Sequence, residues 1–215
     1  MFLDYYLRIK IKRSHMDILE ITRKQDPLYP TFEQIYTASF PLFEQRTEEQ
    51  QEQAFQSPNY HLVAYLKDNL FIGFISYWDF STYVYIEHFA IHENFRGQGY
   101  GGLLLEDFNK RLNKIILLEI DPITDEISSK RLKFYKKCGF FENHYNHFHP
   151  PYRNTYRGHA LIILTTERQI TEDEYIQFGF DLRNIVMANE EINIKAPIVS
   201  SIKALLNHQK PKIMN

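Results

Sequence analysis

The sequence predicts a single α/β domain, because strand-like and helix-like segments alternate along a chain of 215 residues. Short runs of β-branched and aromatic residues indicate strands, and longer segments with apolar residues at helical intervals indicate helices. In order, these patterns predict one strand, two helices, three strands, a helix, a strand, a helix and two strands. The length suffices for one domain and a short appendage, but not for two independent cores.

The composition indicates a folded globular protein and limits its chemistry. Hydrophobic residues make up 44% and charged residues 24%, so neither disorder nor a fibrous repeat fits. The formal net charge of −2 lacks the basic excess of a general nucleic-acid binder, so any phosphate recognition must be local. The single cysteine, Cys138, excludes an intrachain disulfide and favours a reducing compartment. Because no apolar run approaches the roughly 18 residues of a membrane span, we predict a cytoplasmic protein with no membrane or nucleic-acid partner.

The first half of the chain predicts a strand, two helices and a three-stranded meander. Residues 1–15 are rich in basic side chains, and we expect an N-terminal extension there. Capping-box spacing at Thr31 and at Thr47 predicts the starts of the two helices. A turn at residues 67–69 joins two strands, and a third strand runs from Tyr83 to Ile91.

Alternation along this third strand assigns its side chains to two faces. Tyr85, Glu87, Phe89 and Ile91 share one face, and His88 points to the other. Glu87 is therefore expected to project beside aromatic neighbours, with His88 directed away from it.

The second half predicts two more strand–helix units and a helical appendage. Leu104 and Phe108 lie four apart and predict an amphipathic helix. Residues 114–120 indicate a buried strand, residues 128–137 a short helix, and two strands follow. We expect the main domain to span residues 16–166, and residues 167–215 to form a helical appendage and tail. Capping-box spacing at Thr171 predicts the start of the helix in this appendage.

A glycine-rich segment, Arg96 to Gly102, lies between a predicted strand and a predicted helix. Glycine allows the backbone to approach a ligand closely, and N–H groups at a helix start attract anions. Glycine in the first turn of a helix costs stability unless something requires it. The segment therefore predicts a phosphate cradle.

A dinucleotide site is the competing interpretation of these glycines. Gly97, Gly99 and Gly102 satisfy G-x-G-x-x-G, and Glu119 and Asp121 lie near the place of a ribose-binding acid. Three features count against a dinucleotide site. Five residues separate the strand from the first glycine, a strand meander precedes the unit, and a second βαβ half is missing. A P-loop is excluded because no Gly-Lys-Ser/Thr follows. A dinucleotide-binding oxidoreductase is therefore the weaker alternative.

Arg96-x-x-Gly99-x-Gly101 resembles the pyrophosphate-binding signature of the GCN5-related N-acetyltransferase (GNAT) superfamily, Gln/Arg-x-x-Gly-x-Gly/Ala. The surrounding FAIHENFRGQGYGGLLL resembles that family's strand, loop and helix, and FYKKCGF resembles its later helix-to-strand segment. The resemblance covers roughly residues 16–166. It implies an α/β fold with a mixed, mostly antiparallel central sheet of about seven strands, flanked by helices, with a splayed central strand pair.

The resemblance also implies acetyl-coenzyme A as co-substrate and no metal. The acceptor would be a primary amine, on a small molecule or a protein, that attacks directly in a ternary complex. The implied cofactor-binding residues are Phe89, Ala90 and Ile91 of the strand, Arg96, Gly97, Gln98, Gly99, Tyr100, Gly101 and Gly102 of the cradle, and Ser128. Ser128 and Arg131 depart from the Asn and Ala often found at their positions. A homodimer is a further expectation, which the sequence neither requires nor excludes.

The chemistry needs a proton acceptor, because an alkylammonium is mostly protonated at neutral pH. Glu87 is the leading candidate, since desolvation by its aromatic neighbours is expected to raise its pKa. Glu119 is the second candidate. The resemblance implies that Tyr135 protonates the leaving thiolate. A non-catalytic acyl-coenzyme A sensor of the same fold is the alternative to an enzyme.

Three histidines, His144, His147 and His149, form the pattern H-x-x-H-x-H. Such spacing is compatible with a metal site, but the segment is rich in proline and tyrosine and connects the last two strands. We expect this connection to form a wall of the acceptor pocket, because loops on a rigid sheet commonly set specificity.

Overall fold

The computed structural model of this chain describes residues 16–188. The expected extension over 1–15 and the tail over 189–215 lie outside the described residues. The strands are β1 (Asp17–Glu20), β2 (Tyr60–Lys67), β3 (Leu70–Asp79), β4 (Tyr83–Ile91), β5 (Ile115–Ile120), β6 (Phe140–Glu142), β7 (Phe148–His149), β8 (His159–Ala160) and β9 (Ile162–Thr166). The helices are α1 (Tyr29–Ser39), α2 (Glu48–Gln56), α3 (Tyr100–Arg111), α4 (Glu126–Lys137) and α5 (Glu172–Asp181), with short helical turns η1 (Leu42–Glu44), η2 (Glu93–Phe95) and η3 (Leu182–Val186). The predicted succession is confirmed, and the β7–β8 pair is an addition to it.

Seven strands form one sheet in the order β1-β2-β3-β4-β5-β9-β6. Only β4 and β5 pair in parallel within it, and the other neighbours are antiparallel. This mixed, mostly antiparallel sheet with flanking helices confirms the predicted fold class. A doubly wound dinucleotide fold requires a mostly parallel sheet, so the topology excludes the oxidoreductase alternative.

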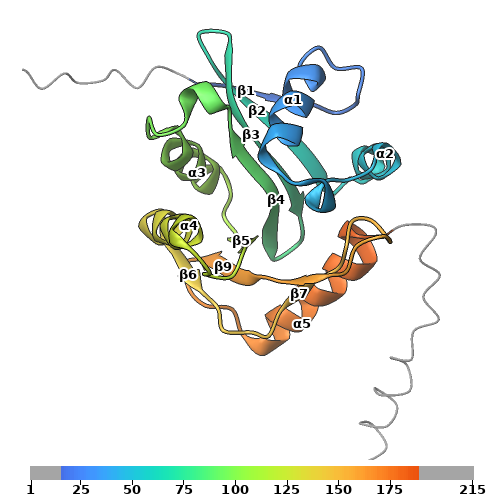
Figure 1. Ribbon diagram of the computed structural model, residues 1–215, viewed down its shortest axis with the longest axis vertical. Coiled ribbons are helices and arrows are strands. Elements are labelled where there is room, and N and C mark those ends of the chain that lie inside the picture. Colours follow the sequence, from blue (N-terminus) through green and yellow to red (C-terminus); the bar gives the residue numbers. More distant parts are fainter. Residues whose placement is uncertain (1–15, 189–215) are drawn as a thin grey trace, which may run out of the picture.

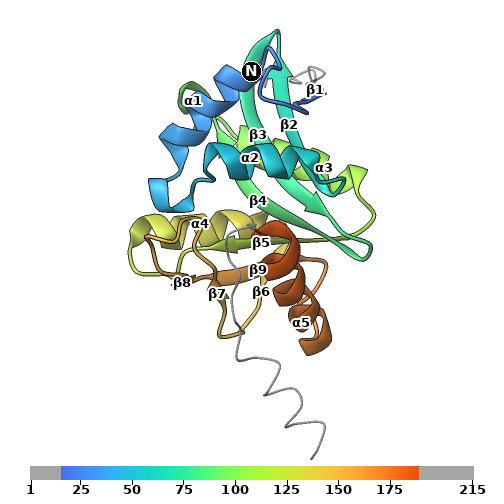
Figure 2. The same cartoon turned by 90° about the vertical axis from the view of Figure 1, so that its right-hand side faces the viewer.

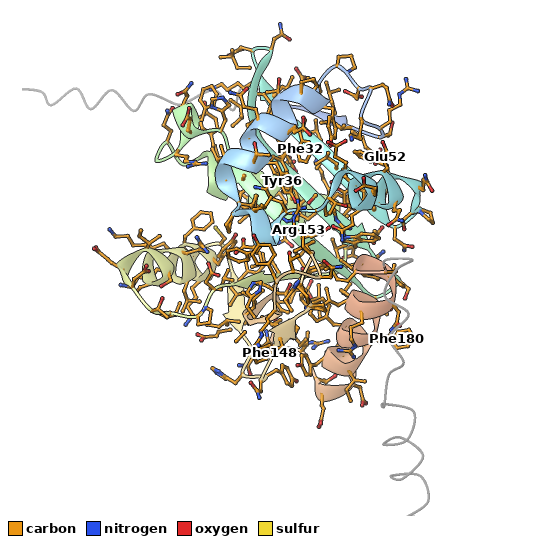
Figure 3. All side chains as sticks on the ribbon, turned by 45° about the vertical axis from the view of Figure 1, so that its right-hand side comes forward. Phe32, Tyr36, Glu52, Phe148, Arg153 and Phe180 are labelled. Atoms are coloured by element: carbon orange, nitrogen blue, oxygen red, sulfur yellow. The ribbon has the colours of Figure 1, made fainter. Side chains whose placement is uncertain are left out.

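Helices cover both faces of the sheet, with α1, α2 and α5 on one face and α3 and α4 on the other (Figure 1). Phe32 and Tyr36 point from α1 into the core between this helix and the sheet (Figure 3), where Phe32 meets Phe74 of β3 at a ring-centroid distance of 4.7 Å. On the opposite face, Phe108 of α3 meets Tyr77 of β3 at 4.9 Å. These large side chains bury much of the apolar area that stabilises the domain. Among the described helices, none combines the length and apolarity needed to cross a lipid bilayer.

Local sequence signals set several helix ends. Thr47 and Thr171 each form a capping box with the residue three positions later, as predicted, and so satisfy free N–H groups of α2 and α5. The capping box expected at Thr31 is wrong, because α1 already begins at Tyr29. Pro30 lies in its first turn, where the N–H that proline lacks would have no helical partner.

β4 carries one extra residue relative to β3. Ser76 pairs with His88 and Tyr77 pairs with Ile86, so Glu87 has no partner in β3. A bulge of this kind shifts the alternation of side chains by one position. Glu87 and His88 therefore face the same side of the sheet, and the expectation that His88 points away is wrong.

β4 and β5 separate immediately after this bulge. Their parallel pairing runs from Tyr83 with Ile115 to Ile86 with Leu118 and ends there. β5 continues beside β9, whereas β4 continues beside β3 up to Ile91, and the two strands diverge (Figure 1). The splayed central pair implied by the family resemblance is therefore present.

The described part of the expected appendage packs against the domain core. α5 lies beside the lower half of the sheet (Figure 2), and Phe178 meets the Tyr85 ring at a centroid distance of 5.2 Å. The Tyr83 hydroxyl donates a hydrogen bond to Asp181 Oδ2 at 2.9 Å. Residues 167–188 therefore share the hydrophobic core of the main sheet.

We expect Gly73→Ala to lower the free energy of unfolding by about 1–3 kcal/mol, the usual range for overpacking. A Cβ at Gly73 would lie 2.5 Å from the carbonyl oxygen of Ala90 and 2.9 Å from Ile91 Cδ1, so β3 and β4 would have to move apart. Urea unfolding followed by circular dichroism measures the change.

Gly102→Ala is the matched control for that substitution. A Cβ at Gly102 meets no described atom within 4 Å, and alanine is the better helix former in this first turn of α3. Its stability should stay equal or rise. Equal losses in both variants would contradict the close approach of β3 and β4 at Gly73.

Candidate active site

A cleft of about 810 Å³ opens where β4 and β5 diverge. One wall consists of β4 from Tyr85 to Ile91, and the other of residues 118–121 at the end of β5. The glycine segment and α4 border one end of the cleft. Residues of the α1–α2 connection and of the loop before β9 also line the cleft. The bulge and the splay thus create a cavity at the centre of the sheet.

The glycine segment, Arg96 to Gly102, leads into α3 and is named the cradle below; its binding of a phosphate stays a prediction. Gly97 and Gly99 have φ angles of 74° and 83°, in the left-handed region that favours glycine. An added Cβ at either position would meet no described atom within 4 Å, so the backbone conformation rather than crowding within the chain calls for glycine. Gly99 caps α3 without a side-chain hydrogen bond, so the first-turn N–H groups keep their donor capacity. Gly101 differs, because its Cβ would lie 3.2 Å from Phe134 Cζ.

Arg96 joins the cradle to two neighbouring elements. Its Nε donates to the carbonyl oxygen of Ile91 at 3.0 Å, and its Nη2 donates to Ser39 Oγ at 3.0 Å. The predicted cofactor-binding residues that line the cleft are Phe89, Ala90, Ile91, Arg96, Gly97, Gly99, Gly101 and Gly102. Gln98 and Tyr100 lie outside that lining; Gln98 Nε2 donates to Asn94 O, and the Tyr100 hydroxyl accepts from Lys67 Nζ.

Ser128 also lies away from the cleft lining. Its hydroxyl closes a capping box with Asp125 at the start of α4, donating to Asp125 Oδ1 at 2.7 Å. The same oxygen accepts from the backbone N–H of Thr124 at 3.1 Å. The structure therefore gives Ser128 a role in the helix cap, and its contact with a cofactor stays a prediction.

Glu87 lies at the bulge as a fully buried carboxylate with a donor on each oxygen. Oε1 lies 2.8 Å from Arg46 Nη2 and accepts from the Tyr152 hydroxyl at 3.0 Å, and Oε2 accepts from Trp78 Nε1 at 2.7 Å. Burial by itself would raise the pKa of Glu87, but the charge of Arg46, with a smaller effect of His88, leaves the pKa below its usual value. The expected rise of its pKa is therefore wrong, because the sequence did not show the buried arginine.

Glu119, the second candidate, is a buried carboxylate with its own set of donors. Oε2 accepts from the Tyr85 hydroxyl at 2.5 Å, and Oε1 pairs with His147 Nε2. His149 Nε2 lies 3.8 Å from Oε2. Burial opposes ionisation, but His149, His147 and the tyrosine together hold the pKa of Glu119 below its usual value. Two of the three motif histidines thus surround one carboxylate.

The loop before β9, residues 143–161, lines the cleft with His149, Tyr152 and His159, and its role as a wall of an acceptor pocket stays a prediction. The Tyr145 and Tyr175 rings stack at 4.1 Å, which fixes the loop to α5. Arg153 lies between the loop and the upper half of the molecule (Figure 3), and its Nε donates to the carbonyl oxygen of Leu42 in η1 at 3.2 Å. Among the described residues, no group of three His, Cys, Asp or Glu side chains is arranged to hold a metal ion.

Tyr135 of α4 lines the cleft near the cradle. Its ring packs against Phe134 at 5.1 Å and Phe140 at 5.6 Å. Burial raises its pKa to about 12, with Arg131 acting in the opposite direction. The hydroxyl therefore stays protonated at neutral pH and can donate. Cys138, at the end of α4, has a pKa raised by burial and is a poor nucleophile at neutral pH.

Arg46 and Trp78 are functional candidates that the sequence did not reveal. Arg46 is 9% exposed, and its guanidinium lies 5.4 Å from the Trp78 ring centroid and 5.8 Å from that of Tyr152. No motif surrounds Arg46 in the sequence. The single tryptophan of the chain was the available signal, because a buried indole N–H needs an acceptor such as Glu87.

Glu44 is a further carboxylate on the cleft wall. No described residue donates a hydrogen bond to its carboxylate oxygens. Burial, followed by the charge of Asp121, raises the pKa of Glu44 to about 7. Its backbone carbonyl accepts from His88 Nε2 at 3.0 Å, which ties η1 to β4.

A mixed sheet with one parallel central pair, splayed beside a glycine cradle, defines the class of GNAT-type folds. The comparisons with known proteins agree. Residues 57–142 match the family model described as Acetyltransferase (GNAT) domain. Residues 57–142 therefore carry a domain of GNAT type, as the motifs of the sequence predicted.

Individual relatives share part or most of the chain. YjbC of Bacillus subtilis (strain 168), named as an acetyltransferase, is 33% identical over 78 residues, which span 35% of this chain and 40% of YjbC. A GNAT-family structure from Bacteroides thetaiotaomicron has a TM-score of 0.75 at 29% identity and covers 81% of this chain and 99% of its own. Arabidopsis thaliana Naa50, solved with the bisubstrate analogue CoA-Ac-MVNAL, shares the fold with a TM-score of 0.52 at 17% identity, over 71% of this chain and 99% of that chain.

We expect Arg46→Met to destabilise the protein by about 3–5 kcal/mol, because Glu87 would keep a buried charge without its partner. Adding Glu87→Gln should recover part of this loss, since the double variant buries no unpaired carboxylate. Thermal and urea unfolding measure both effects. Arg131→Met, which removes the half-exposed pair with Asp121, is the control and should cost no more than about 1 kcal/mol. Comparable losses in the two single variants would contradict the buried pair.

Proposed function

We propose that this chain is an N-acetyltransferase that transfers the acetyl group of acetyl-coenzyme A to a primary amine by direct attack in a ternary complex. The observation that carries the proposal is the cleft between β4 and β5, which opens at the bulge and ends at the cradle. The match of residues 57–142 to the GNAT family model supports the same conclusion. A small-molecule amine or a protein amino group is the proposed acceptor, and a homodimer and a cytoplasmic location stay predictions.

The residues present fit coenzyme A at the donor end of the cleft. Gly97, Gly99 and Gly102 leave open space where side chains would stand, and the uncapped start of α3 offers N–H donors to a diphosphate. Phe89 to Ile91 have β3 on one side and no strand partner on the other. That edge suits the amide groups of a pantetheine arm, which can pair as an added strand. Naa50 supports this placement, as a protein of the same fold solved with an analogue that contains coenzyme A.

The proposed chemistry divides between two groups at the cleft. Tyr135 keeps its proton at neutral pH and lies beside the cradle, so we assign it to the thiolate that leaves. The assignments of Glu87 and Glu119 as proton acceptors stay predictions, and the contacts weigh against them, because every oxygen of both carboxylates already has a donor.

The primary test combines calorimetry with acetyl-coenzyme A and an assay of free thiol released with an amine panel: spermidine, lysine, kanamycin and a peptide with a free N-terminus. Binding together with thiol release would support the enzyme. Binding without turnover on a broad panel would favour the acyl-coenzyme A sensor, and absence of binding would overturn both.

We expect Gly102→Asp to weaken acetyl-coenzyme A binding by roughly tenfold or more, which is about 1.4 kcal/mol, because it places a carboxylate where the diphosphate would lie. Folding should be unaffected, since an acidic residue is favourable in the first turn of a helix. Calorimetry gives the affinity, and Gly102→Ala is the uncharged control. Unchanged affinity in the aspartate variant would place the diphosphate elsewhere.

We expect Tyr135→Phe to lower kcat about 10²- to 10⁴-fold if its hydroxyl serves as the general acid. The affinity for acetyl-coenzyme A should stay nearly unchanged, because the ring and its packing remain. Steady-state kinetics with calorimetry separates the two quantities. Loss of affinity with normal turnover would refute this role.

A further inference from the structure

His149 lines the cleft, and one hydrogen bond determines the tautomer of its neutral ring. Its Nδ1 lies 2.6 Å from the carbonyl oxygen of Pro150, and a carbonyl only accepts hydrogen bonds. Nδ1 therefore carries the hydrogen, and in the neutral ring Nε2 carries a lone pair. Nε2 has no hydrogen-bond partner among the described residues, and His149 lines the cleft.

Glu119 is placed to stabilise His149 after the ring gains a proton. Nε2 lies 3.8 Å from Glu119 Oε2, so a proton on Nε2 would face the carboxylate. The Tyr85 hydroxyl and His147 hold this carboxylate in position and as an anion. The Pro150 carbonyl at Nδ1 thus orients the ring from behind, and Glu119 supplies a compensating negative charge on the Nε2 side, as general-base catalysis requires.

The other groups around His149 are aromatic or neutral. The Tyr152 ring stacks on it at 5.2 Å with an interplanar angle of 26°, and His159 of β8 lies at a centroid distance of 6.0 Å. Burial lowers the pKa of His159. Burial also lowers the pKa of His88 on β4, whose ring lies 5.7 Å from that of Tyr152. Glu119 is therefore the charge closest to His149 among these neighbours.

The remaining carboxylates of the cleft lack one of these features. Glu87 is bound to Arg46 and has a side chain with 0% exposure. Glu44 has a free carboxylate, but no described hydrogen bond fixes its direction. His149 combines a free acceptor atom, a fixed ring and a compensating charge.

We propose that Nε2 of His149 is the general base of the transfer, with Glu119 as its positioning residue, an assignment that rests on the proposed acetyltransferase function. The amine nitrogen forms a bond to the thioester carbon and gives one proton to Nε2. The carbon–sulfur bond breaks, its electron pair leaves with the sulfur, and the sulfur takes a proton from Tyr135. The imidazolium then loses its proton to water, and the tyrosine regains one, so the products are the acetylated amine and free coenzyme A.

The test uses the full chain and the best amine of the panel. His149→Gln should lower kcat about 10²- to 10⁴-fold with unchanged affinity for acetyl-coenzyme A. Glu119→Gln should lower kcat with an unchanged KM for the amine, because the amide leaves the ring in place but no longer balances the positive charge that the ring gains during the transfer. His144→Gln is the matched control, since His144 belongs to the same motif but is exposed, and it should retain wild-type activity.

Chemical rescue guards against a purely structural effect of these substitutions. In His149→Ala, added imidazole should restore part of the lost activity, whereas a folding defect would not respond. A wild-type protein that releases thiol, with His149→Gln equally active, would overturn the base assignment and leave the proposed function standing. So would loss of activity in Glu44→Gln but not in His149→Gln. A wild-type protein that releases no thiol with any amine would overturn the proposed function and this assignment together.

Discussion

The extra residue at Glu87 in β4 is the constraint on which the site depends. Because Ser76 pairs with His88 and Tyr77 with Ile86, the strand shifts by one position at that point. β5 stops following β4 at the same level, and the central parallel pair opens. Without this bulge β4 would continue beside β5, and backbone hydrogen bonds would close the space now lined by both strands.

Burying two carboxylates next to that opening requires compensation, and the fold supplies it twice. Arg46 and Trp78 satisfy Glu87 at the bulge, and Tyr85 with His147 satisfies Glu119 across the cleft. A buried charge without partners would cost several kilocalories per mole, so these contacts are conditions for the folded state. They also hold the polar side chains of the cleft in fixed directions, which a catalytic site needs before a substrate arrives.

The two ends of the cleft differ in how they are built. At the proposed donor end the backbone offers the binding groups, through uncapped N–H groups and a free strand edge. At the proposed acceptor end side chains offer them, from η1 and the loop before β9, which Arg153 joins to each other. Backbone groups serve the same ligand in many sequences, whereas loop side chains are free to differ, so this loop is where acceptor specificity is expected to reside.

The sequence by itself determined the succession of strands and helices, the caps at Thr47 and Thr171 and the glycine cradle, because periodicity, capping and φ preference act within a few residues. It also carried the family resemblance, through two short motifs. Tertiary structure decided the rest. The bulge placed His88 on the opposite face from the one predicted, because the alternation of residues along the sequence does not show where a strand carries an extra residue. The folded sheet joins segments far apart in the chain, and so it places Arg46 beside Glu87 and His149 beside Glu119. The contact with Arg46 lowers the pKa of Glu87, whereas the neighbours of Glu87 in the sequence predicted a raised pKa.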